Sequence, residues 1–489
     1  LILASIYAKA IERGEPQEQA EEKTDNAFNK IKDDLIMEGK ISLENYDIDE
    51  DILRCLLGNH TNEYVYPAFA RYFSEGTEEK GTRAIVSRGT IEDAFGQVLD
   101  QKVVSTPQTR EPLQTTIDAG LQRYFYGRFE SGLRALGRES GVGIALNPQN
   151  GEILALVSLP SFDNNIFVDR SRNQERNNLL TSRSQPLFNR AVAGVYSPGS
   201  TIKPLVALSA LKEGIIDAHD QIYSAGFLEI PNPYQPDSPS IFLDWKPHHW
   251  VDLAAALAKS SNVYFYLVGG GLPQSIRAED LTRGNFQVTG LGISRLHAYW
   301  KKFGFGSKTR IDLPFEGLGF LPEAEEKEAR TGEPWRLGDT YNVSIGQGDL
   351  LVTPLQLINF VASVGNGGKI YKPFIRKNEA PEILADYSDW QKEIREVQIG
   401  LEDAVQKPYG SSYFLSDLPF KVAGKTGTPQ IDNNTKTNAI FAGFAPAADP
   451  QIAILVIVEN VREGSLNALP IAKDVLRWYY ENRLKNNTQ

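Results

Sequence analysis

Three short polar motifs in this chain carry the residue types needed for acyl transfer by an activated serine. They are Ser200–Lys203, Ser260–Asn262 and Lys425–Thr428, in this order along 489 residues. A serine attacks a carbonyl group when a neighbouring base takes its proton, and a neutral lysine is one such base. A Ser-x-x-Lys pattern arises by chance on the order of twice in a chain of this length, so it has little weight alone. Lys-Thr-Gly-Thr is expected by chance in roughly one such chain in a hundred, and the ordered set of three is therefore a strong signal.

The first motif has the spacing of two side chains on one helix face, because Ser200 and Lys203 are three residues apart. Turn-forming residues precede Ser200, and Pro204 suits the first turn of a helix. We therefore predict Ser200 at a helix N-terminus, where the helix dipole stabilises a developing alkoxide. Lys203 can take the serine proton only if burial and a second cation lower its pKa, and Lys425 is the candidate cation. A capped surface helix with an exposed lysine would show the same residues.

The second motif follows a helical segment, residues 252–259, and precedes the aromatic run 263–266. The hydroxyl of Ser260 could relay a proton to a leaving amine. Asn262 offers a donor and an acceptor that could orient a substrate amide. A polar turn between a helix and a loop is the structural alternative.

The third motif follows a strand-like segment and offers groups that could bind a substrate. Gly427 leaves room for a ligand backbone at a strand edge. Thr426 and Thr428 offer hydroxyls, and Lys425 offers charge for a substrate carboxylate. The backbone N–H groups of Thr428 and Ser200 are candidates for an oxyanion hole. An ordinary turn at an edge strand is the alternative.

Two other clusters of residues are better explained as structural features than as functional sites. Asp244, His248 and His249 could bind a metal ion, but two adjacent histidines are poor tetrahedral partners, and loop packing explains them better. Gly346 and Gly348 have the spacing of a phosphate loop without its Gly-Lys-Ser/Thr ending. The sequence therefore predicts neither a metal nor a cofactor.

Composition indicates a globular protein of two or more domains. Hydrophobic residues make up 41% of the chain and charged residues 23%. The net charge of −11 disfavours a surface that binds nucleic acid. Cys55 is the single cysteine, so an intrachain disulfide is impossible. The chain has neither a run of ~20 apolar residues nor a secretory signal, and its start at Leu1 leads us to expect a trimmed N-terminus.

The pattern of elements predicts an α+β domain from residue 112 to 489 and a separate domain over residues 1–111. Apolar alternation predicts two antiparallel pairs near the ends of the larger region, which we expect to share one sheet with helices between them. The paired segments are 142–146 with 152–159 and 439–444 with 452–458; helices are expected from Asp118 and over 468–482; and the proline-rich residues 219–250 are expected to form an extended loop or small subdomain.

Residues 1–111 are predicted to form a small α/β accessory domain without a catalytic motif. Helical periodicity covers residues 2–13 and 17–38. A linker-like composition around residues 106–112 marks the boundary.

The three motifs resemble the signature motifs of penicillin-binding proteins and serine β-lactamases. The surrounding sequence is similar to class B, monofunctional transpeptidases over about residues 112–483. Within this class, residues 244–248 and 261–266 resemble most the elongation type, penicillin-binding protein 2. Other similar segments are Thr116–Gln122, Asn147–Ala155, Pro160–Asp163, Ser197–Pro204, Ser344–Gly348, Thr353–Gln356 and Gly443–Pro446.

The resemblance implies a transpeptidase domain with a central antiparallel sheet flanked by helices. It implies that Ser200 attacks the D-Ala-D-Ala carbonyl of a peptidoglycan stem pentapeptide and that a neighbouring stem's amine resolves the acyl-enzyme. β-Lactams would acylate the same serine. The implied catalytic residues are Ser200, Lys203, Ser260, Asn262 and Lys425, and the implied substrate-binding residues are Thr426, Gly427 and Thr428.

The resemblance also implies a partner and a location. Residues 1–111 loosely resemble the non-catalytic pedestal or dimerisation domain of this family, truncated at its N-terminus. Class B enzymes usually act with a membrane glycan polymerase, which this domain would contact. The expected location is the bacterial cytoplasmic membrane, with the catalytic domain outside the cytoplasm and the anchor absent from this chain.

Two other functions remain open from the sequence. One is a hydrolase of the same fold, a D,D-carboxypeptidase or β-lactamase, for which Glu333 is a conceivable water-activating base. The other is a non-enzymatic β-lactam sensor. The acceptor amine, the oligomeric state and the choice between elongation and division stay undetermined at this stage.

Overall fold

The computed structural model describes residues 113–167, 170–231, 237–431, 436–461 and 467–485, and the backbone of two short paired strands, β1 (Gly89–Glu92) and β2 (Val98–Lys102). The chain divides into two compact units, Leu1–Leu113 and Gln114–Gln489. The helices expected over 2–13 and 17–38 lie outside the described residues. The assignment of residues 1–111 as an accessory domain therefore stays a prediction.

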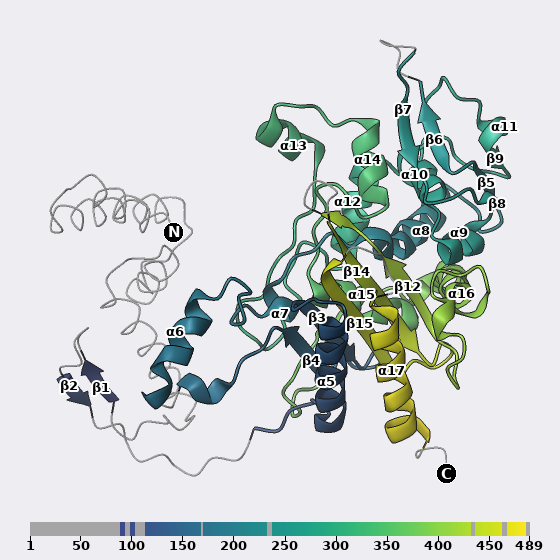
Figure 1. Ribbon diagram of the computed structural model, residues 1–489. Coiled ribbons are helices and arrows are strands. Elements are labelled where there is room, and N and C mark those ends of the chain that lie inside the picture. Colours follow the sequence, from purple (N-terminus) through teal and green to yellow (C-terminus); the bar gives the residue numbers. More distant parts are fainter. Residues whose placement is uncertain are drawn as a thin grey trace, which may run out of the picture. The chain divides into compact units, whose positions relative to one another are not determined.

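A six-stranded antiparallel sheet lies at the centre of the second unit (Figure 1). Its strand order is β12-β14-β15-β3-β4, and the short β13 also pairs with β14. Because β15 pairs with β3, the two predicted hairpins share one sheet, and that prediction is confirmed. The strands are β3 (Gly141–Leu146), β4 (Ile153–Leu159), β12 (Ala423–Gly427), β13 (Gln430–Ile431), β14 (Lys436–Ala445) and β15 (Ile452–Val461).

Helices α5 (Ala119–Ala135) and α17 (Leu469–Tyr479) pack together against one face of this sheet (Figure 1). Strand residues alternate between the two faces, as the two-residue period of a strand requires. On β15, Ile454, Val456 and Val458 belong to the core beneath α5 and α17, whereas Ala453, Leu455 and Ile457 belong to the larger core on the opposite face.

The helix that the sequence predicted from Asp118 begins there. The Asp118 carboxylate accepts hydrogen bonds from the backbone N–H groups of Gly120 (3.0 Å) and Leu121 (3.1 Å), which is the usual role of an N-cap residue. The predicted C-terminal helix is also confirmed, and its end continues as a π-helical turn over Tyr480–Leu484.

Helix α15 (Pro354–Gly365) packs across β14, β15 and β3 on the opposite face. Thr353 and Gln356 form a capping box at its N-terminus, so two unpaired backbone donors are satisfied there. The other helices that border the three motifs are α8 (Lys203–Lys212), α9 (Leu253–Lys259), α10 (Asn262–Gly270) and α16 (Gln391–Gln406).

The proline-rich residues 219–250 form a small subdomain of short strands, which is one of the two structures predicted for them. Strand β5 pairs with β8, and β6 pairs with β7. These strands are β5 (Gln221–Ser224), β6 (Phe227–Ile230), β7 (Ser240–Leu243) and β8 (His249–Val251).

The remaining elements lie around this framework (Figure 1). Among the described residues, none of the helices is both long and apolar enough to cross a membrane. In the part of the chain that the structure describes, the other α-helices and strands are α6 (Asn173–Thr181), α7 (Arg190–Ala193), α11 (Ala278–Leu281), β9 (Thr282–Arg283), α12 (Gly292–Lys302), α13 (Ala324–Thr331), α14 (Leu337–Ser344), β10 (Lys369–Tyr371) and β11 (Ile383–Asp386).

Candidate active site

Ser200 lies in a 3₁₀ turn over Gly199–Ile202 that leads directly into α8 at Lys203. Side chains three residues apart are eclipsed in 3₁₀ geometry, so Ser200 and Lys203 lie on the same side of the turn. Ser200 is partly buried, and Lys203 is completely buried. The structure thus places Ser200 in a tight turn before the helix and makes Lys203 the first residue of the helix itself.

A glycine-rich loop, Ser344–Gly348, holds this turn in place. The N–H of Gly199 donates to the carbonyl oxygen of Gly346 (2.9 Å). A Cβ added at Gly346 would lie 2.2 Å from the carbonyl oxygen of Gly199, closer than any side chain allows. Residue spacing assigns no role to these glycines, because they lack the ending of a phosphate loop, and only their place in the family resemblance pointed to this site.

Lys203 joins the first motif to the second. Its Nζ donates to the carbonyl oxygen of Ser260 (2.8 Å) and to Oδ1 of Asn262 (2.7 Å), and it lies 3.5 Å from the Ser260 hydroxyl. Ser260 ends α9 in the left-handed conformation, with φ 59°, and the chain then enters α10 at Asn262. The tight turn therefore presents a carbonyl, a hydroxyl and an amide oxygen to one amine.

Burial changes the protonation of both motif lysines. It lowers the pKa of Lys203 to about 7, while the Asp244 carboxylate acts in the opposite direction. Burial and then the cation of Lys203 hold the pKa of Lys425 well below its usual range. The charge of Lys203 therefore acts on Lys425, whereas burial and Asp244 account for the shift of Lys203. The predicted role of Lys425 as the cation that lowers the pKa of Lys203 stays a prediction.

Strand β12 brings the third motif against the turn that carries Ser200. A Cβ added at Gly427 would lie 2.9 Å from the carbonyl oxygen of Pro198 and 3.1 Å from Cγ2 of Thr201. Glycine at position 427 therefore allows the turn that carries Ser200 to pack closely against β12. The sequence had suggested a different reason for glycine here, namely space for the backbone of a ligand.

Lys425 is 1% exposed, and its Nζ donates to the carbonyl oxygen of Thr426 (3.1 Å). The predicted contact of Lys425 with a substrate carboxylate stays a prediction. Thr426 is buried and Thr428 is partly exposed at the end of the strand. The binding roles of Thr426, Gly427 and Thr428 stay predictions.

Strand β12 lies at the end of the strand order and pairs with β14. An edge strand has backbone N–H and C=O groups on its outer side, where an extended peptide can add as a further strand. The arrangement can therefore hold a peptide backbone beside the Ser200 turn.

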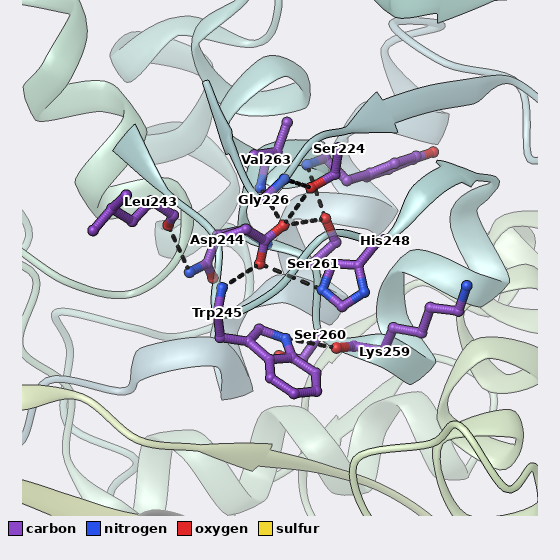
Figure 2. A network of polar contacts seen from close by, with 12 residues as sticks. Ser224, Gly226, Leu243, Asp244, Trp245, His248, Lys259, Ser260, Ser261 and Val263 are labelled. Carbon is purple, nitrogen blue, oxygen red and sulfur yellow. Dashed lines mark hydrogen bonds and ion pairs between the residues drawn. The ribbon is translucent and has the colours of Figure 1, made fainter. Parts of the chain in front are cut away.

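Asp244 lies next to the three motifs, at a position that the sequence did not predict. Its carboxylate lies at the centre of a buried network beneath the second motif (Figure 2). It accepts hydrogen bonds from the hydroxyls of Ser224 (3.0 Å) and Ser261 (2.7 Å) and from the backbone N–H groups of Trp245 (3.0 Å), Asn262 (2.9 Å) and Val263 (3.2 Å). The sequence favours loop packing over a metal site for Asp244, and the segment of Asp244 also contributes to the family resemblance.

The two neighbouring histidines take different positions. Nε2 of the buried His248 lies 3.5 Å from the Asp244 carboxylate, whereas His249 is exposed and packs near the ring of Tyr223. Within the described ranges, no group of three or more His, Cys, Asp or Glu side chains is placed to hold a metal ion.

Glu333, the conceivable water-activating base, is exposed in the segment between α13 and α14. Its carboxylate lies 3.6 Å from the guanidinium of Arg336. This contact gives the hydrolase alternative no support.

Comparison with known proteins agrees with the geometry. Residues 141–477 match the family model of the penicillin binding protein transpeptidase domain. The chain belongs to this family.

The chain is similar to curated peptidoglycan D,D-transpeptidases named MrdA and to solved structures of penicillin-binding protein 2. Peptidoglycan D,D-transpeptidase MrdA of Haemophilus influenzae is 33% identical over 419 residues, which cover 78% of this chain and 59% of the relative. The chain thus spans about three fifths of the length of this curated relative.

Two solved structures share the fold. Penicillin-binding protein 2 of Pseudomonas aeruginosa, in complex with WCK 5153, is 31% identical, with a TM-score of 0.63 and coverage of 77% of this chain and 80% of that one. Penicillin-binding protein 2 of Helicobacter pylori, in complex with MreC, is 27% identical, with a TM-score of 0.65 and coverage of 81% and 69%.

Proposed function

We propose that the protein is a serine D,D-transpeptidase that cross-links peptidoglycan stem peptides through an acyl-enzyme on Ser200. The observation that carries the proposal is the buried amine of Lys203, one 3₁₀ turn from Ser200 and held by Ser260 and Asn262 at 2.7–2.8 Å. A lysine whose pKa is lowered to about 7 is partly neutral at neutral pH and can act as a general base.

Acylation follows from this arrangement. Neutral Lys203 takes the proton from the Ser200 hydroxyl as its oxygen attacks the carbonyl carbon of the penultimate D-Ala. The backbone N–H groups of Ser200 and Thr428 stabilise the oxyanion. The C–N bond then breaks, and the Ser260 hydroxyl relays a proton from Lys203 to the departing D-Ala amine. An ester on Ser200 and free D-Ala result.

Deacylation reverses these roles. An amine from a neighbouring stem peptide attacks the ester carbonyl and gives up a proton to Lys203 through Ser260. The ester C–O bond then breaks, the new amide forms, and Lys203 returns a proton to the Ser200 oxygen. A β-lactam enters the first step in the same way. Because its leaving group stays tethered to the acyl-enzyme, the second step is blocked, which makes penicillin a covalent probe of Ser200.

The wider setting is also proposed from the relatives. Penicillin-binding protein 2 of H. pylori has been solved with MreC, and this supports an elongation-type partner for our chain, together with a membrane glycan polymerase. We assign partner contact to residues 1–111 and acyl transfer to residues 112–489. The proposed location is the outer side of the bacterial cytoplasmic membrane.

Product analysis tests the proposed reaction. The chain is incubated with a stem pentapeptide that ends in D-Ala-D-Ala and with a stem peptide as amine acceptor, and products are separated by mass. The expected result is a cross-linked dimer with release of one D-Ala, both lost in Ser200→Ala. Tetrapeptide formed by hydrolysis without any dimer would instead identify a carboxypeptidase. Ser209→Ala, on the same helix α8, serves as the control that retains activity.

A further inference from the structure

The second motif rests on a buried negative charge that takes no part in the reaction proposed above. Asp244 is 8% exposed, and its carboxylate comes from the segment between β7 and β8. Burial alone would raise the pKa of Asp244, but His248, the N–H of Asn262, the Lys203 cation and Ser261 together hold it well below the usual range. Asp244 is therefore a carboxylate throughout the pH range in which the enzyme would work.

This carboxylate caps the helix that begins with Asn262. The N–H groups of Asn262 and Val263 lie in the first turn of α10 and have no partner within the helix. Both donate to Asp244, at 2.9 and 3.2 Å. The Ser261 hydroxyl also donates to Asp244 (2.7 Å) while accepting from the N–H of Tyr264 (3.3 Å). An anion at a helix N-terminus is also favoured by the helix dipole.

The segment that carries Asp244, residues 243–245, also sets the direction of the Asn262 side chain. Nδ2 of Asn262 donates to the carbonyl oxygen of Leu243 (3.2 Å), so its Oδ1 is free to face Lys203 at 2.7 Å. Next to Asp244, the Trp245 indole donates to the carbonyl oxygen of Lys259 at the end of α9 (3.1 Å; Figure 2). Residues 243–245 therefore hold the end of α9, the start of α10 and the amide that binds the base.

The charged groups around this network are few within the described residues. Asp244 is faced by Lys203 on α8, by His248 from the segment before β8 and by Tyr266 on α10, whose pKa is raised by burial, so that it stays neutral. Lys203 is faced by Asp244 and by Lys425 on β12. Asp244 is the negative charge in this set, so its removal leaves Lys203 beside another amine.

We propose that Asp244 is a positioning residue for acylation: it fixes Asn262, and through it the amine of Lys203, and its charge stabilises the lysine when the lysine holds the Ser200 proton. This proposal rests on the proposed function of Ser200 and Lys203. Asp244 need not touch the substrate to act in this way.

The rate of acylation of the full chain by a fluorescent penicillin, followed from roughly pH 5 to 9, tests the proposal. The variant is Asp244→Asn, which keeps the shape of the side chain and removes its charge. The matched control is Asp252→Asn, which makes the same change at the N-cap of α9, where Asp252 accepts from the N–H of Ala255 (2.9 Å). Asparagine caps a helix about as well as aspartate does, so this control should behave like the wild type.

We expect Asp244→Asn to lower the highest acylation rate by about a hundredfold. Both carboxylate oxygens of Asp244 accept at least two hydrogen bonds, so the amide nitrogen of asparagine would face donors at either position, and the base would lose its alignment. The acid side of the pH profile should also move to lower pH, since a carboxylate that favours protonated Lys203 is gone. A residue that only maintained the fold would reduce the fraction of active protein and leave the profile in place. An unmoved acid side, or a highest rate within about threefold of wild type, would overturn the proposal.

Two further variants keep the test decisive if Asp244→Asn does not fold. Ser261→Ala removes one hydrogen bond to Asp244 and keeps the charge, so the highest rate should fall about tenfold with the acid side unmoved. His248→Gln removes the other titratable neighbour, and the acid side should again stay in place. A Ser261→Ala variant with the full rate would overturn the positioning role. Failure of the wild type itself to form an adduct on Ser200 would instead contradict the proposed function.

Discussion

Lys203 is an amine that is buried and held by neutral oxygen atoms, with one carboxylate and one further amine nearby. Burial disfavours its charge and lowers its pKa to about 7. Ser260 and Asn262 fix where its lone pair can point. Lys203, Ser260, Asn262 and Lys425 could be predicted from the sequence because they lie within the three motifs, whereas the carboxylate of Asp244 lies outside them.

The pKa of Lys203 predicts how acylation depends on pH. Below about pH 7 the amine is protonated and cannot accept the Ser200 proton, so the rate should fall about tenfold for each unit that the pH decreases. Measurement of the penicillin acylation rate against pH checks this. A rate that stays constant down to about pH 5 would show that another group is the base.

Replacing the base by arginine separates charge from base function. Lys203→Arg keeps a cation at the site, but a guanidinium does not deprotonate in proteins. We expect acylation to fall by about 10²–10⁴-fold, measured with labelled penicillin on protein whose fold is checked by circular dichroism. Appreciable acylation by this variant would contradict the assignment of Lys203 as the base.

Residue types and spacing could not assign a role to Asp244 or Gly346, although both lie in segments that resemble the family. Asp244 is 18 residues from the N–H of Asn262 that it accepts, and Gly346 is more than a hundred residues from Gly199. Such contacts depend on how distant segments pack, which no local spacing reveals.

At the scale of elements, the site depends on a 3₁₀ turn held between an edge strand and a glycine-rich loop. Gly346 has φ +75° and lies against the backbone of Gly199. Gly348 has a similar φ of +66°, yet its nearest neighbours to an added Cβ are 3.5 and 3.6 Å away. These two glycines share the same backbone requirement and differ in the space around them.

This difference gives a matched pair of variants. Gly346→Ala should displace the Ser200 turn and lower acylation by more than about tenfold, because a 1 Å misplacement of a reacting group can cost about 10² in rate. Gly348→Ala should cost about 1 kcal/mol of stability from its positive φ and leave acylation nearly unchanged. Penicillin acylation and thermal melting of both variants check this, and equal effects on acylation would refute the bracing role of Gly346.

The elements that the sequence predicted correctly have strong local patterns. The hairpin strands alternate between two cores, and α5 begins at a capping aspartate. The 3₁₀ turn was not predicted, because its few residues also suit the start of an α-helix. The strands within residues 221–251 have only three or four residues each, and prolines lie in the segments between them. The sequence therefore left an extended loop and a small subdomain both open.

At the scale of the whole second unit, Gln114–Gln489, segments from its two ends share one sheet and one pair of helices that covers a face of this sheet. β3 pairs with β15, and α5 packs against α17. Arg483 Nη2 donates to Asp118 Oδ1 at 2.8 Å, which joins the start of α5 to the turn after α17. The shared sheet could be predicted from the two hairpins, whereas this ion pair spans 365 residues and could not.

The ion pair predicts a pH-dependent contribution to stability. The hydrogen bond from Arg483 is the main cause that lowers the pKa of Asp118 below its usual 3.8. Its contribution is therefore complete above about pH 4 and is lost as the pH falls through the lowered pKa.

Asp118→Asn keeps the helix cap and removes the charge pair, so it should lower stability by about 1 kcal/mol at neutral pH. Thermal melting should show that this difference from the wild type shrinks at acid pH. Asp118→Ala, which also loses the cap, should be less stable still at neutral pH. Equal melting temperatures of the wild type and Asp118→Asn at neutral pH would contradict this role.

The central claim is that Ser200 forms a lasting acyl-enzyme, and intact-mass spectrometry with penicillin tests it most directly. Wild type should gain the mass of one penicillin and keep it over time, with the adduct on the peptide that contains Ser200. Ser200→Ala should gain none, while Ser209→Ala should behave like the wild type. A Ser200→Ala protein that still forms the adduct, or a wild type that quickly returns to its unmodified mass as the drug is hydrolysed, would contradict the account.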